Sequence, residues 1–196
     1  MQIKRNTLMI SILTLFPVVA FAHVGHDGGV HHLLSFTQGF VHPFTGIDHL
    51  VVMLLVGVWS VMNTRQWWLA PSAFAVMLLA GAMIGMAGIV PEATESLVAV
   101  SLLVIGLMVS FQLKLRVATG AAIIGSFALF HGLAHGAELA HSAAALAGMA
   151  FATVCLHLMG LGIGYLLTSS PAHRIWSRVF GISASLMSVG ALCGIF

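Results

Sequence analysis

The chain has 196 residues, of which 60% are hydrophobic and only 6% are charged, and its formal net charge is +2 with the histidines neutral. Soluble domains carry about 25% charged residues, so this composition excludes an ordinary water-soluble domain and predicts an all-α integral membrane protein. The nearly balanced charge gives no sign of a nucleic-acid partner. Eleven histidines outnumber the five Asp and Glu residues, which is the unusual feature of so apolar a chain.

Residues 1–22 have the organisation of a signal peptide. A basic start precedes the apolar stretch LMISILTLFPVVA, and the small-x-small pattern AFA follows it. We predict cleavage after this pattern, because the apolar stretch is short and polar sequence follows at once; a signal anchor that stays attached is the alternative. The mature chain then begins at His23 outside the cytoplasmic membrane, and residues 23–196 form a single polytopic membrane domain.

Apolar segments long enough to cross a membrane as helices follow the signal. Turn or charge signals separate six of them, at approximately 47–64, 67–90, 97–113, 117–134, 142–168 and 179–196. We therefore predict a bundle of about six transmembrane helices in the bacterial cytoplasmic (inner) membrane. The boundary after the fourth span is open, since HGAELAH is a helix end, a turn or a re-entrant piece.

The basic residues of the loops orient this bundle. With the mature N-terminus outside, every basic residue after the signal falls on the inner side, in agreement with the positive-inside rule. These residues are Arg65, Lys114, Arg116, Arg174 and Arg178. We predict that both the N-terminus and the C-terminus lie outside.

Pairs of glycines four residues apart lie within the spans, among them Gly81 with Gly85 and Gly160 with Gly164. Small residues at this spacing let helix backbones approach closely, so we expect these pairs to mark helix contacts. No linker or low-complexity segment interrupts the spans, which predicts one compact membrane domain.

The first polar cluster is HPFTGIDH, which begins at His42 and leads into the first span. In one straight helix His42 and His49 would stand about 10 Å apart, too far to share an ion. Pro43 and Gly46 disfavour a regular helix, and a bent entry brings His42 back over Asp48 and His49. Imidazole and carboxylate together suit borderline divalent metals such as Ni, Co, Zn or Cu. The alternative is that Asp48 complements a helix dipole and the histidines are interfacial side chains.

The second polar cluster is FHGLAHGAE. His131 and His135 are four residues apart and Glu138 continues the same helical stripe, so all three side chains are expected on one face. Gly132 stands where an HExxH motif has its glutamate, which argues against a metalloprotease. A polar cap at the helix end is the alternative. In the predicted topology both clusters lie on the outer side of the membrane, so we expect them to contribute to one site.

Four residues are weaker candidates for metal contact. His23 and His26 lie in a Gly-rich stretch and either collect metal or belong to a polar leader. Glu95 lies near the outer end of the third span and either lines a vestibule or is a solvated loop residue. His157 lies within the fifth span, away from its ends, where ionisable residues often mark ion pathways.

Taken together, the His-rich start HVGHDG, HPFTGIDHLVVMLLVGVW and FHGLAHGAE resemble the HupE/UreJ family of hydrogenase and urease accessory membrane proteins. The resemblance covers essentially the whole chain, and similar His-Asp-His signatures occur in the broader nickel/cobalt transporter class. It implies a secondary permease that imports Ni²⁺ or Co²⁺, without a permanently bound cofactor. By motif it implies transport roles for five residues, with His131 beside them: His42, Asp48, His49, His135 and Glu138.

The expected partners are a divalent metal ion as substrate and the lipid bilayer. No GxxxxGK[ST] motif occurs, so we expect neither ATP hydrolysis nor another enzymatic activity from this chain. Two other classes stay open. One is a membrane-embedded metalloenzyme, for which Glu138 is the carboxylate within the second motif. The other is a b-type haem protein with axial histidines on facing helices, for example His135 and His157.

Overall fold

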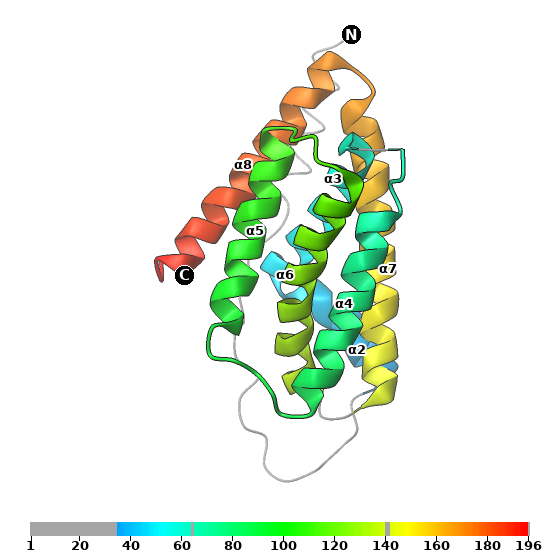
Figure 1. Cartoon of the computed structure of the whole chain (residues 1–196), viewed down its shortest axis with the longest axis vertical. Helices are drawn as coiled ribbons and strands as arrows, with labels where there is room; N and C mark the ends of the chain where they lie inside the picture. The colour runs from blue at the N-terminus through cyan, green and yellow to red at the C-terminus, as the bar shows by residue number, and fades with distance from the viewer. Residues whose placement is uncertain (1–34, 64, 140–141, 196) are drawn as a thin grey trace. The chain divides into compact units, whose positions relative to one another are not determined.

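The computed structural model describes residues 35–63, 65–139 and 142–195. These residues form helices and no strand (Figure 1), which confirms the predicted all-α class. The predicted signal peptide, His23 and His26 lie outside the described residues. The seven helices are α2 (Phe36–Thr45), α3 (Ile47–Asn63), α4 (Leu69–Met86), α5 (Thr94–Ser110), α6 (Val117–Glu138), α7 (Ala143–Thr168) and α8 (Pro171–Leu192).

The helices α2 and α3 meet at a bend of 85°. Ser35 caps the start of α2, because its hydroxyl accepts from the Gln38 N–H at 3.2 Å while its own N–H donates to Gln38 Oε1 at 2.7 Å. Gly46 ends α2 in an extended conformation, and α3 begins at the next residue. The break expected at Gly46 is therefore present. Pro43, in contrast, lies inside a helix that the predicted first span did not include.

Glycines bring pairs of helices into close contact. A Cβ added at Gly81 or Gly85 of α4 would collide with the backbone of α6. One added at Gly160 or Gly164 of α7 would collide with the backbone of α3. The predicted contacts at these glycine pairs are confirmed, and they hold α6 against α4 and α7 against α3.

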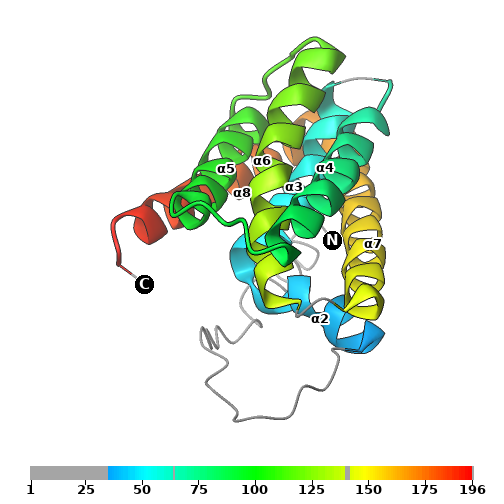
Figure 2. The same cartoon turned by 60° about the horizontal axis from the view of Figure 1, so that its bottom comes forward.

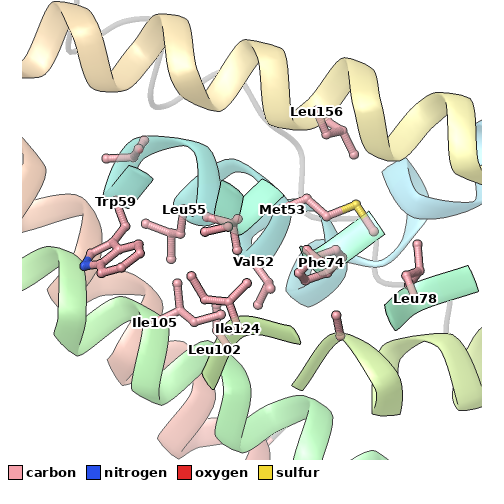
Figure 3. Packing of buried hydrophobic residues seen from close by; sticks show 14 of the residues in the cluster. Val52, Met53, Leu55, Trp59, Phe74, Leu78, Leu102, Ile105, Ile124 and Leu156 are labelled. Carbon is pink, nitrogen blue, oxygen red and sulfur yellow. The ribbon is translucent and has the colours of Figure 1, made fainter. Parts of the chain in front are cut away.

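The hydrophobic core surrounds α3, whose buried residues are apolar except for Ser60. Met53, Leu55 and Trp59 of α3 are buried and pack among apolar side chains from the neighbouring helices (Figure 3). The outer faces of the bundle are apolar as well, as the exposed side chains of Val76 and Leu186 illustrate. Apolar side chains on both the inner and the outer faces are typical of helices that lie in lipid.

Four described helices are long and apolar enough to cross a membrane: α4, α6, α7 and the His173–Leu192 part of α8. The bent pair α2–α3 is a fifth candidate, and α5 is a shorter apolar helix of 17 residues. These helices indicate a multi-pass membrane protein, whereas the count of six spans and the orientation stay predictions.

Two helix boundaries differ from those expected. The helix α6 continues through Glu138, so within the described residues the open boundary is a helix end. The helix α8 begins at Pro171, well before the predicted start of the last span at 179, because Ser170 caps it and Pro171 occupies its first turn. The predicted span began too late because charged residues near the start of α8 were assigned to a loop. A helix turn at the membrane interface can contain such residues.

One end of the bundle holds the end of α3, the segment 111–116 and the start of α8. The Asn63 side chain donates to the Leu115 carbonyl at 3.1 Å and accepts from the Leu115 N–H at 2.8 Å. The Gln112 amide donates to the Arg174 carbonyl at 3.4 Å. The end of α6 lies at the opposite end, and the α2–α3 bend lies in the half of the bundle nearer to it (Figure 1). The basic loop residues and the two histidine motifs therefore occupy different halves of the bundle.

Candidate metal site

The candidate site lies where the α2–α3 bend meets the last two turns of α6. Figure 2 shows α2 beside the end of α6 at this end of the bundle. The bend places His42 in the last turn of α2 and His49 in the first turn of α3. Thr45 helps to end α2, because its hydroxyl donates to the His42 carbonyl at 2.7 Å. Since the two histidines belong to differently directed helices, both reach α6.

Three side chains form the first part of the site, which we call the three-ligand group: His42, His135 and Glu138. His42 Nε2 lies 2.8 Å from His135 Nδ1 and 2.9 Å from Glu138 Oε2. One ligand atom from each residue lies within 4.8 Å of the others. His135 is buried, whereas the Glu138 side chain is 61% exposed. The group therefore extends from the surface into the helix bundle.

The second part is the His49–His131 pair. The two Nδ1 atoms lie 3.0 Å apart, and Asp48 Oδ2 lies 3.6 Å from His49 Nε2. The His49 ring also packs against the His135 ring, with 4.2 Å between the ring centroids. His49 thus connects the pair to the three-ligand group, so the structure brings all six principal residues of the two sequence motifs to one place.

Glycines in α6 set the direction of its histidines. A Cβ at Gly132 would collide with the Leu78 carbonyl in α4, and one at Gly136 would collide with the Ala82 carbonyl. These two glycines therefore face α4. Successive residues of an α-helix point about 100° apart, so His131 and His135, which directly precede these glycines, point away from α4. His131 contacts His49 of α3, and His135 contacts His42 of α2.

His135 carries a free ligand atom. Its Nε2 is buried and has no hydrogen-bond partner among the described residues. Leaving a buried polar atom without a hydrogen-bond partner costs about 1–3 kcal/mol of folding free energy. Because His135 Nε2 lies beside several other ligand atoms, a bound ion is a suitable partner for it. Imidazole nitrogens with one carboxylate oxygen fit a borderline divalent cation.

Glu95 and His157, the two weaker candidates among the described residues, lie outside both parts of the site. Glu95 is exposed in the first turn of α5. His157 is buried in α7, and its Nε2 also has no hydrogen-bond partner in the part of the chain that the structure describes. The Phe74 ring contacts both His157 and His131, with centroid distances of 5.0 and 5.7 Å. A single aromatic ring thus connects His157 to the His49–His131 pair.

Ser101 of α5 is a residue that sequence reasoning missed. Its hydroxyl oxygen lies 2.7 Å from His131 Nε2. A serine within an apolar helix usually bonds only to its own backbone, so its sequence position gives no signal of this contact.

Comparison with known proteins adds independent information. The family described as "HupE / UreJ protein" matches residues 11–192, a range that includes both histidine motifs and all seven described helices. The chain is 34% identical over 199 residues to Protein HupE of Rhizobium leguminosarum bv. viciae, and the alignment covers 99% of this chain and 100% of that protein. No solved structure matches the chain.

Proposed function

The chain belongs to the HupE/UreJ family, and from this premise we propose that it is a secondary permease for Ni²⁺ or Co²⁺. It imports the ion across the bacterial cytoplasmic membrane for the maturation of metalloenzymes such as hydrogenase or urease. The observation that carries this proposal is the convergence of four histidines and Glu138 from three helices. Ionisable residues within membrane helices are costly and by default mark an ion pathway.

Entry of the ion begins at the exposed side of the three-ligand group. The hydrogen bond that now joins His42 to Glu138 is broken as the ion takes its place, and these side chains replace part of the water bound to the ion. His23 and His26, near the start of the mature chain, collect the ion before this step. Asp48, which is partly exposed, adds negative charge at the same end of the bundle.

The next step transfers the ion to more deeply buried ligands. His135 belongs to the three-ligand group and packs against His49, so a short displacement brings the ion to the His49–His131 pair. His157 lies beyond Phe74 and offers the next buried nitrogen along the path. Each stage must bind the ion moderately, because an ion held too tightly would not leave.

The membrane potential supplies a driving force for this movement. A negative interior favours the entry of a cation by roughly 2.3 kcal/mol per elementary charge per 100 mV of membrane potential. For a divalent cation the gain is therefore about 4.6 kcal/mol per 100 mV. The sequence has no P-loop for ATP hydrolysis. Facilitated diffusion down the electrochemical gradient is therefore sufficient for uptake.

The haem and metalloenzyme alternatives have less support. The His135 ring packs against His42 and His49, and the His157 ring packs against Phe74, so neither imidazole faces an open space of the kind that a porphyrin requires. A metalloenzyme would need a general base beside the ion, whereas Glu138 is itself one of the proposed ligands. An absorption spectrum of the purified protein tests the haem alternative, since a Soret band would contradict the permease.

Uptake of trace nickel by cells that lack their other nickel importers tests the permease itself. We expect His49→Ala and Asp48→Asn to abolish most accumulation at equal protein level. Gly162→Ala is the control, because a Cβ there meets no atom within 4 Å. If the two site variants accumulate nickel as well as the wild type, the proposed site is wrong. Parallel uptake of Ni, Co, Zn and Cu determines the selectivity.

A further inference from the structure

Ser101 is a completely buried polar residue of α5 that lies outside both histidine motifs. Its Oγ lies 2.6 Å from the carbonyl oxygen of Val98 and 2.7 Å from Nε2 of His131. The hydroxyl thus stands between a backbone acceptor on its own helix and an imidazole on α6.

The hydrogen-bond roles at Ser101 have one consistent assignment. A serine hydroxyl has a single proton to donate, and a carbonyl oxygen can only accept. The contact with Val98 is therefore a bond from the Ser101 hydroxyl to the carbonyl. Ser101 Oγ must then accept from His131, which requires a proton on His131 Nε2. The opposite assignment would leave two oxygens 2.6 Å apart with no proton between them.

We propose that Ser101 is a positioning residue that holds neutral His131 in the tautomer with its proton on Nε2. The lone pair of His131 is then on Nδ1, the atom that faces His49 Nδ1 at 3.0 Å. The assignment of the proton stands on the hydrogen bonds alone. Its consequence for metal transport rests on the proposed function.

The separation of the two Nδ1 atoms suits neighbouring ligands of one ion. Imidazole nitrogens bind first-row divalent ions such as Zn²⁺ at about 2.0–2.1 Å, so two ligands at a right angle lie about 2.9 Å apart. Without an ion, His49 donates its Nδ1 proton to His131 Nδ1. For an ion to bind both Nδ1 atoms, His49 has to shift this proton from Nδ1 to Nε2, the atom that faces Asp48 Oδ2 at 3.6 Å, and so stays neutral. The lone pair of His131 is already in place, because Ser101 keeps the proton of that ring on the far side.

Ser101 therefore acts on the ion through His131. Metal-binding histidines usually donate their second N–H to a carboxylate, a carbonyl or water, and loss of such a partner typically costs 10–100-fold in metal affinity or activity. In Ser101→Ala the buried Nε2–H would lose its acceptor, and the tautomer with the proton on Nδ1 would compete. That tautomer places an N–H where the ion has to bind.

The first test is the kinetics of nickel uptake at matched protein level. We expect Ser101→Ala to raise KM about 10–100-fold, and Ser101→Thr, which keeps the hydroxyl, to restore uptake close to that of the wild type. Ser60→Ala is the matched control, because Ser60 is also buried and donates to a carbonyl of its own helix, Val56, at 2.7 Å, with no described imidazole as partner. An unchanged KM in Ser101→Ala would overturn the proposal.

The second test does not depend on transport. Imidazole ¹⁵N NMR of the purified metal-free protein distinguishes the two tautomers, and loss of a signal in His131→Gln assigns it to His131. We expect protonation on Nε2 in the wild type and a mixture of tautomers in Ser101→Ala. Protonation of His131 on Nδ1 in the wild type would overturn the role of Ser101 and leave the permease intact. If NMR shows His131 protonated on Nε2 but the wild-type protein takes up no metal, the Ser101 assignment is supported and the permease is refuted.

Discussion

Gly46→Ala tests how closely the α2–α3 bend is fitted to the site. The backbone angles at Gly46, φ −90° and ψ 111°, are open to any residue, so the substitution introduces a problem of space rather than backbone strain. An added Cβ would lie 2.9 Å from His49 Cδ2 and 3.1 Å from Asp48 Oδ1. Carbon atoms in good contact lie about 3.5–4.0 Å apart, so the His49 ring would have to move by roughly 0.6 Å or more.

The His49 ring has little freedom to make this movement. Its Nδ1 is 3.0 Å from His131 Nδ1, and its ring packs 4.2 Å from the His135 ring between centroids. Binding constellations must be held within about 0.5 Å of the productive geometry. We therefore expect Gly46→Ala to weaken Ni²⁺ binding by 10–100-fold, which corresponds to about 1.4–2.8 kcal/mol.

Equilibrium binding of Ni²⁺ to the detergent-purified protein measures this effect without any assumption about transport. Gly162→Ala makes the same chemical change in α7, where a Cβ meets no atom within 4 Å, and should bind as the wild type does. An affinity of Gly46→Ala within about twofold of the wild type would refute the argument from crowding. Equal losses in both variants would show that the effect does not arise at the bend.

Three further predictions address the ligands, the packing and the buried His157. Glu138→Gln keeps the shape of the side chain but removes its charge, so calorimetric titration should show at least about tenfold weaker Ni²⁺ binding. Glu92→Gln, at an exposed position between α4 and α5, is the control and should bind Ni²⁺ as the wild type does. Gly136→Ala forces a Cβ against the Ala82 carbonyl, so thermal melting in detergent should show a loss of about 1–3 kcal/mol in stability relative to Gly162→Ala. An unchanged melting temperature would mean that α4 and α6 can separate freely. His157→Leu removes a buried nitrogen without a hydrogen-bond partner among the described residues, so its melting temperature should equal or exceed that of the wild type while nickel uptake falls; normal uptake would make His157 a packing residue.

That the residues of the candidate site lie close together was partly predictable, because local spacing carries much of the information. The separation of His131, His135 and Glu138 places them along one face of a helix, and all three lie in α6. Gly46 signalled a break before the first span, and the bend is there. The partners across the site were not predictable in the same way. The contacts of His42 with His135 and of His49 with His131 depend on how α2 and α3 pack against α6 on either side of the bend, which no local pattern determines.

The helix α2 was missed for a physical reason. It has only 10 residues and contains Pro43, so its sequence alone gives weak support for a helix. Long-range packing stabilises α2 as well, because Gly39 lies directly against Ala145 of α7, and Gly148 of α7 lies against Phe36. Ser101 was missed for the same reason, since its partner His131 is 30 residues away. In both cases tertiary contacts decide the structure.

The packing also divides the helices around the candidate site into two sets. Glycine contacts fix α6 to α4, while other glycine contacts fix α7 to α2 and α3. The short polar contacts of His42 with His135 and Glu138, and of His49 with His131, each join a residue of α2 or α3 to a residue of α6. In the proposed permease, an ion bound at this boundary would link the two sets of helices. Its release would then loosen the boundary, where Gly120 of α6 meets the Trp59 ring of α3 rather than a backbone.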